Sequence, residues 1–143
     1  MVAYGFKSRF AEPILAGTKR QTIRAIGKRR HARPGETLQL YTGMRTKHCR
    51  LIMKAECEAV LSVVIDWLPD IPTIKIAGVR IATVRKAVDE FARSDGFRDI
   101  DEMRAFWAKE HSGVDYFEGI MIVWKSPAVA EREMMAGVIR GLP

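Results

Sequence analysis

One stretch, residues 13–24, most constrains how this chain of 143 residues can fold. It opens as a single helical turn, which Gly17 can end because glycine readily adopts the left-handed conformation found there. Residues 21–24 then predict a strand, with Thr22 and Arg24 on one face. A short helix followed directly by a strand is therefore expected near the N-terminus.

Three polar side chains meet at this junction. Lys19 lies in the turn just before the strand, and Thr22 and Arg24 follow on one face of it. An ammonium, a hydroxyl and a guanidinium group placed together can hold an anion or the polar edge of a base. A solvated basic loop followed by an ordinary edge strand would give the same pattern.

Four short motifs occur in an order that resembles the ASCH family (activating signal cointegrator homology). The family opens with Ile-Leu-x-Gly-x-Lys-x-x-Thr-x-Arg, and residues 14–24 match that pattern at every fixed position. Pro-Gly-Glu-x-Leu at 34–38, Phe-Ala-x-x-Asp-Gly-Phe at 91–97 and Phe-x-Gly at 117–119 fit the family in the same order. The resemblance spans about residues 4–125.

This resemblance implies a fold and a class of activity. The fold would be α+β, a small PUA-like mixed β-barrel of about five to seven strands with two or three flanking helices, over residues 1–127. Family members bind RNA or DNA, and one branch is similar to N4-acetylcytidine amidohydrolase, which uses a Lys, a Thr and a Glu. The Lys and Thr would correspond to Lys19 and Thr22, and the residue nearest to the Glu is Asp95.

The distribution of charge independently favours a polyanionic partner. The net charge is +7, but residues 1–54 hold thirteen Lys or Arg and two acids, whereas the remainder holds eleven bases and fifteen acids. A basic half of this kind attracts phosphates, because neutralising each one releases counterions. A surface that merely keeps the protein soluble is the alternative.

We predict a basic cleft that binds single-stranded RNA or a modified nucleoside. Lys19, Thr22 and Arg24 would form its floor and Asp95 the opposite lip, and Arg20 would also contact the ligand. The remaining wall would consist of one aromatic and two basic residues, because a ring can stack on a base while cations meet the phosphates; these are Tyr41, Arg45 and Lys47.

The basic run Gly27–Arg33 has no hydrophobic period and ends at a Pro-Gly pair, so it predicts a loop. It could clamp a phosphate backbone or be a solvated hairpin tip. Farther along, Asp99 and Glu102 predict the start of a helix through a capping box. Phe106 and Trp107 on that helix are expected to pack in the core rather than to stack on bases.

Two kinds of hydrolase are alternatives to a binding module. In an amidohydrolase of the N4-acetylcytidine type, Thr22 would attack, Lys19 would accept its proton and Asp95 would protonate the leaving amine or position Lys19. In a metal-independent ribonuclease, Lys19, Lys47 or His48 would stabilise charge at the scissile phosphate. The residue types and spacing do not decide between them.

The sequence also indicates where the protein works. Cys49 and Cys57 read as buried or half-buried thiols of a reduced cytoplasm, and there is no apolar run of about 18 residues. No His and Cys cluster has metal-ligand spacing, so we expect no metal and no cofactor. The tail 128–143 could form a short helix, and a homodimer formed through it is an open alternative.

Overall fold

The computed structural model describes residues 1–127 and 134–135, and it has the mixed α+β composition that the sequence predicts. The elements follow in this order: β1 (Val2–Phe6), the 3-10 turn η1 (Ser8–Phe10), α1 (Ala11–Ala16), β2 (Gln21–Arg24), β3 (Thr37–Thr42), β4 (Arg50–Asp66), β5 (Thr73–Ile76), β6 (Val79–Arg80), α2 (Arg85–Ser94), α3 (Ile100–Glu110) and β7 (Tyr116–Lys125).

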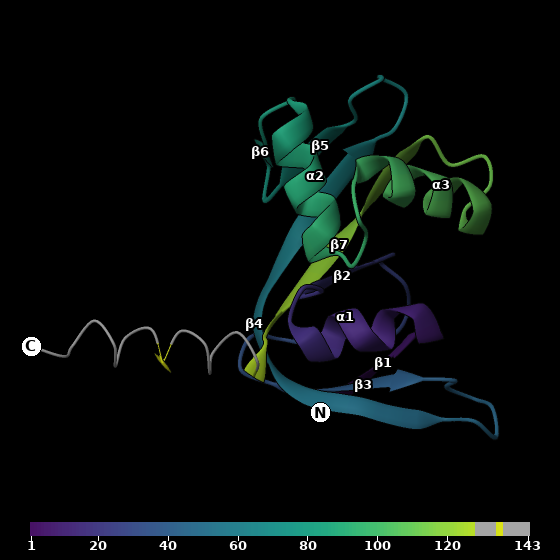
Figure 1. Cartoon of the computed structure of the whole chain (residues 1–143), viewed down its shortest axis with the longest axis vertical. Coiled ribbons are helices and arrows are strands. Elements are labelled where there is room, and N and C mark those ends of the chain that lie inside the picture. Colours follow the sequence, from purple (N-terminus) through teal and green to yellow (C-terminus); the bar gives the residue numbers. More distant parts are fainter. Residues whose placement is uncertain (128–133, 136–143) are drawn as a thin grey trace, which may run out of the picture.

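The seven strands form one sheet that is organised around the long strand β4. Its first half pairs with β3, its second half pairs with β5, and β7 runs antiparallel along most of its length. β1 adds to β3 in parallel, and β2 adds to β7. Figure 1 shows that the sheet bends strongly along β4. A register shift between Cys57 and Ala59 lies within that strand, and such bulges bend and twist a sheet.

β1 and β2 are two of the three edge strands of this curved sheet, and β6 is the third. Within the described residues β1 and β2 share no backbone ladder. The side chain of Arg24 joins them instead, since its guanidinium donates a 2.8 Å hydrogen bond to the carbonyl oxygen of Gly5. This bridge brings the first strand and the residues after α1 to one place.

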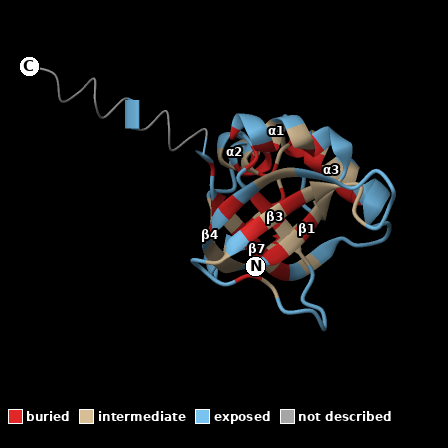
Figure 2. Cartoon of the chain, turned by 90° about the horizontal axis from the view of Figure 1, so that it is seen from below, coloured by how far each residue is buried: buried red, intermediate tan, exposed pale blue. Residues whose placement is uncertain are grey.

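The core follows the period of two along the strands. Residues 36–42 alternate in hydropathy, which predicts that Leu38 and Leu40 face inward. Both are fully buried on β3, and so is Ile122 of β7. In Figure 2 the buried residues colour the central strands, and the three helices lie together along one side of the sheet. The apolar run 119–124 predicts a fully buried closing strand. It forms most of β7, in which Gly119, Met121, Ile122 and Trp124 are buried, whereas Ile120 and Val123 are half-buried.

Local signals correctly predict two helix ends. α1 ends at Gly17, which has a φ of 84°, in the left-handed region. Asp99 begins α3, and its carboxylate accepts a 2.9 Å hydrogen bond from the backbone N–H of Glu102. The Glu102 side chain, however, accepts from the N–H of Arg98 rather than from that of Asp99. The N-terminus of α3 is thus capped one residue further out than a capping box requires.

One prediction about the cysteines is wrong. Cys57 is buried on β4, but Cys49 is exposed, because it belongs to the turn before β4 begins at Arg50. Among the described residues, no helix is long and apolar enough to span a membrane. The helix and the dimer contact predicted for the tail, 128–143, lie almost entirely outside the described residues.

Candidate functional site

A cavity of about 380 Å³ lies where β1, β2 and the residues flanking α3 meet. Its volume falls in the lower part of the range of about 300–1,000 Å³ that small-molecule sites occupy. Six polar or charged side chains and a set of aromatic rings share its wall. The polar group comprises Lys7, Lys19, Thr22, Arg24, Asp95 and His111, and the aromatic group comprises Phe6, Phe10, Phe97, Phe106, Trp107 and Phe117.

Lys19 is held in this cavity by the turn that follows α1. Its backbone N–H donates to the carbonyl of Pro13 at 3.0 Å, which fixes the chain after the left-handed Gly17. The side chain is 3% exposed, and its Nζ atom lies 4.8 Å from the centre of the Phe10 ring and 5.5 Å from that of Phe6. An ammonium group this far from water needs polar partners.

Asp95 supplies those partners from a position 76 residues further along the chain. It ends α2, and the N–H of Arg20 donates to the carbonyl of Ser94 at 2.8 Å, so the two segments are tied together. Lys19 Nζ donates a 2.5 Å hydrogen bond to the backbone carbonyl of Asp95 and lies 3.9 Å from its Oδ1 atom. The fold therefore brings Lys19 and Asp95 into contact.

The shared burial of this pair shifts both groups toward neutrality. Burial lowers the pKa of the Lys19 ammonium from 10.5 to about 8; the Asp95 carboxylate opposes this shift, and Arg24 and Arg9 add to it. Burial raises the pKa of the Asp95 carboxyl from 3.8 to about 6, against the opposing effects of Lys19, Gln21 and Arg24. Titratable groups with such shifts inside a cavity are typical of functional sites.

The polar groups next to the pair are incompletely satisfied by hydrogen bonds. Asp95 Oδ1 and the buried amide nitrogen of Gln21 each lack a hydrogen-bond partner among the described residues. A buried polar atom without a partner costs free energy, so such atoms are often satisfied by a ligand or by water. The carboxylate oxygen therefore offers an acceptor in this cavity.

Thr22 and Arg24 are brought together by β2. They lie on one face of the strand, as predicted, and Arg24 Nε donates to Thr22 Oγ1 at 3.2 Å. The guanidinium of Arg24 also lies over the rings of Tyr4 and Phe6, at 5.2 and 5.1 Å from their centres. A cation that donates to a hydroxyl oxygen favours the deprotonated form of that hydroxyl.

The aromatic wall is the part of the site that the sequence reasoning did not identify. Phe106 and Trp107 were expected in the core, and Trp107 is indeed buried, but both also line the cavity. Their neighbours pack edge to face, with ring centres 5.6 Å apart for Phe10 and Phe106 and 4.8 Å apart for Trp107 and Phe117. Of these rings, Phe97 is the one that the sequence could have assigned to the site, because it lies two residues after Asp95.

The other predicted ligand residues do not line this cavity. Tyr41 lies on β3 beside Gly5, whereas Arg45 and Lys47 are exposed in the turn between β3 and β4, and His48 follows them. Arg20, next to Lys19, points into a different cavity. The sequence placed all of them at one cleft because it could not show on which side of the sheet each turn projects.

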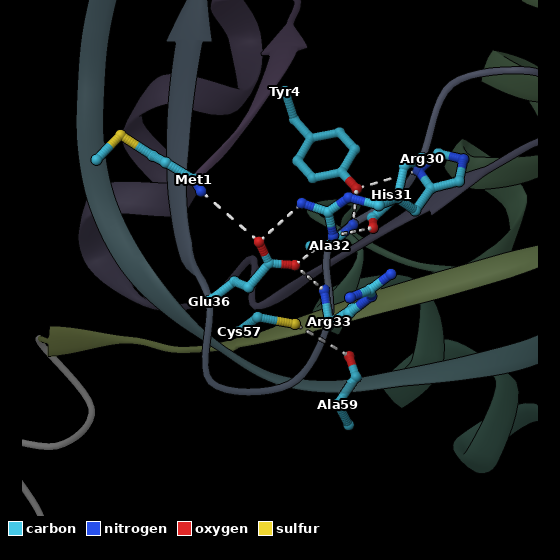
Figure 3. Close-up of polar contacts among 9 residues, drawn as sticks. All are labelled: Met1, Tyr4, Arg30, His31, Ala32, Arg33, Glu36, Cys57 and Ala59. Carbon is cyan, nitrogen blue, oxygen red and sulfur yellow. Dashed lines mark hydrogen bonds and ion pairs between the residues drawn. The ribbon is translucent and has the colours of Figure 1, made fainter.

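The basic loop Gly27–Arg33 is folded against its own domain (Figure 3). Arg30 donates to both carboxylate oxygens of Glu36, and His31 Nδ1 lies 3.0 Å from the hydroxyl oxygen of Tyr4. That hydroxyl also accepts from the buried N–H of Ala32. These contacts give several of the loop's polar groups a structural role.

The part of the chain that the structure describes contains no group of three or more His, Cys, Asp or Glu side chains able to hold a metal ion. The cavity instead offers a buried amine, a hydroxyl, a guanidinium and a carboxyl beneath aromatic rings. Such a set can bind a flat polar molecule and can move protons at its edge. Comparisons with protein-family models, with curated proteins and with solved structures find no match to this chain.

Proposed function

We propose that this protein binds a single nucleobase, either an unpaired base of RNA or a modified nucleoside, in the cavity around Lys19. The observation that carries the proposal is the buried pair of Lys19 and Asp95 at the base of an aromatic-lined cavity. We also propose that the chain belongs to the ASCH family, which it resembles in sequence, and that its curved sheet is PUA-like.

A nucleobase fits the two kinds of lining group. Its faces are apolar and stack on aromatic rings, which Phe97, Phe106 and Trp107 can provide. Its edge carries hydrogen-bond donors and acceptors, and the floor offers donors from Lys19 together with the carboxylate of Asp95, which the Gln21 side chain also approaches. The cavity of about 380 Å³ is too small for a duplex, so the base must be unpaired.

The positive charge of the N-terminal part of the chain favours RNA as the source of the base. Residues 1–54 carry eleven more bases than acids. Binding to a polynucleotide should therefore weaken steeply as salt is added, whereas binding of an uncharged nucleoside should not.

The test is calorimetric titration of the protein with cytidine and with N4-acetylcytidine. We expect binding by the wild type and a loss of at least about tenfold in affinity for Lys19→Met, since one charge-assisted hydrogen bond contributes about 1.5–3 kcal/mol. Lys47→Met is the matched control, because Lys47 is exposed and outside the cavity. Thermal unfolding checks that both variants fold. Equal affinities for the two variants would overturn the proposal.

Hydrolysis of an acylated base amine is a second candidate, favoured by the lowered pKa of Lys19. A lysine with a pKa of about 8 is partly neutral at pH 7.5 and can accept the proton of Thr22. Thr22 Oγ1 would attack the acyl carbon, and the leaving amine would take the proton that Lys19 has accepted, while the Asp95 carboxylate holds Lys19 in place. Water would then cleave the threonine ester, releasing the acid and restoring the hydroxyl.

Mass spectrometry of a short RNA that contains one N4-acetylcytidine tests this chemistry. Loss of the acetyl group with the wild type, and not with Lys19→Met or Thr22→Val, is the expected outcome. An unchanged RNA that still binds would leave the protein as a binding module. Chain cleavage would point to the ribonuclease, for which the geometry gives little support, because Lys47 and His48 do not line the cavity.

A further inference from the structure

A second, wider groove lies directly behind the wall of the candidate site. It runs between the end of α1 and the end of α2 and has a volume of about 800 Å³. Three arginines line it together with small polar residues and one acid. Its lining comprises Pro13, Gly17, Thr18, Arg20, Glu90, Arg93, Ser94, Gly96, Phe97 and Arg98. We call it the α1–α2 groove.

The arginines of the groove are largely free to meet a ligand. Arg20 and Arg93 are exposed, and neither side chain forms an ion pair or hydrogen bond with another described residue. Arg98 pairs with Glu102 at 3.5 Å and is also highly exposed. Glu90 is the single acid in the lining, so the groove is positively charged overall. Guanidinium groups match phosphate oxygens well, since they can donate two parallel hydrogen bonds.

The groove and the cavity share one thin wall, the segment Asp95–Phe97. Asp95 and Phe97 line the cavity, whereas Gly96 and Phe97 line the groove. The carbonyl of Asp95, which accepts from Lys19, belongs to the same segment. The segment that contacts this wall is divided in the same way. Lys19 is buried and lines the cavity, whereas the next residue, Arg20, is exposed and lines the groove. The cavity and the groove are therefore separated by a single peptide segment.

The size of the groove decides what kind of anion fits. Its volume is about twice that of the cavity, which is more than a single phosphate needs. The charged side chains of the groove are all exposed, as expected for a surface along which a charged polymer lies.

We propose that the α1–α2 groove holds the sugar-phosphate backbone of a single RNA strand, with Arg20 and Arg93 contacting phosphates next to the base that enters the cavity. This inference rests on the proposed function, because it concerns the same strand. It predicts that the protein prefers a base within a polynucleotide to the free nucleoside. The preference would be electrostatic and would vanish at high salt.

The experiment compares a short single-stranded RNA with its free nucleoside, using Arg20→Gln, Arg93→Gln and the double variant. We expect each single change to weaken RNA binding about threefold to tenfold. Each lost phosphate contact should lower the slope of log affinity against log salt by roughly 0.7, and nucleoside affinity should stay unchanged. Arg80→Gln is the matched control, because Arg80 is an exposed arginine on β6 outside both sites.

The outcomes separate the two proposals. RNA binding that Arg20→Gln and Arg93→Gln affect no more than Arg80→Gln does would overturn the groove, whatever the nucleoside does. Failure of the wild type to bind any nucleoside, with RNA binding still weakened by Arg20→Gln and Arg93→Gln, would overturn the proposed function and support the groove as a backbone site. Absence of both kinds of binding would overturn both.

Discussion

The ammonium group of Lys19 donates a 2.5 Å hydrogen bond to the backbone carbonyl of Asp95 and lies 3.9 Å from the carboxylate of the same residue. These residues are 76 positions apart in the chain. Burial costs both charges solvation, and one contact between them offsets only part of that cost. The pair is therefore poised to lose its charges, and this property underlies the first prediction.

The stability that this pair contributes should pass through a minimum near neutral pH. The pKa of Asp95 is raised to about 6, so its contribution is full below 3.8 and is lost as pH rises through about 6. The pKa of Lys19 is lowered to about 8, so its contribution is full above 10.5 and is lost as pH falls through about 8. Both contributions are thus smallest between about pH 6 and 8.

Urea unfolding of the wild type and of the double variant Lys19→Met/Asp95→Asn, measured from pH 4 to 10, checks this. The wild-type free energy of unfolding, minus that of the double variant, should be lower by about 1–3 kcal/mol at pH 7 than at either end of the range. A difference that is constant with pH, or largest at pH 7, would contradict the burial of an incompletely compensated pair.

Gly96 should tolerate no side chain. Its φ is 98°, in the left-handed region, and an added Cβ would lie 2.8 Å from Lys19 Cδ and 3.0 Å from Phe10 Cδ1. Gly96→Ala should therefore cost about 2–4 kcal/mol, from backbone strain together with displacement of Lys19 and the buried Phe10 ring.

Gly78→Ala separates the two causes, because Gly78 has a φ of 80° and open space around its Cβ position. It should show the backbone strain of about 1 kcal/mol alone. Chemical denaturation of both variants measures the difference. Equal losses would mean that the wall between the cavity and the groove is looser than the contacts at Gly96 indicate.

Arg24→Lys should destabilise the protein although it preserves the charge. The guanidinium donates to Thr22 Oγ1 and to the Gly5 carbonyl at the same time, and it is the side chain that joins β2 to β1. An ammonium group cannot reproduce this fork, so we expect a loss of about 1–2 kcal/mol in urea unfolding. The exposed Arg20→Lys should change stability by less than about 0.5 kcal/mol. If both substitutions behave alike, Arg24 does not hold the sheet edges together.

Tyr4→Phe tests whether the basic loop is a structural element. The buried N–H of Ala32 donates to the Tyr4 hydroxyl at 3.0 Å, and phenylalanine would leave it without a partner. The expected cost is about 1–3 kcal/mol, together with faster hydrogen exchange at the Ala32 amide. Tyr41→Phe is the control, because no hydrogen bond of the Tyr41 hydroxyl to another described residue is present. Unchanged exchange in Tyr4→Phe would show that this hydrogen bond does not anchor the loop.

The local features of the fold were predictable because they depend on neighbouring residues. Gly17 ends α1 through its own backbone freedom, and Asp99 begins α3 through a hydrogen bond three residues along the chain. The alternation of apolar and polar residues along β3 likewise predicted that Leu38 and Leu40 are buried. The exposure of Cys49 was missed because the start of a strand is set by its partners rather than by its own sequence.

The sequence by itself determined which elements form and which polar groups, Lys19, Thr22 and Arg24, gather at the start of β2, because these depend on helix ends and on the period of a strand. Only the tertiary structure decided what surrounds them. The end of α2 brings Asp95 to Lys19, α3 turns Phe106 toward the cavity, and the turn that carries Lys47 does not reach it. Such contacts depend on how distant segments pack, which no local pattern specifies.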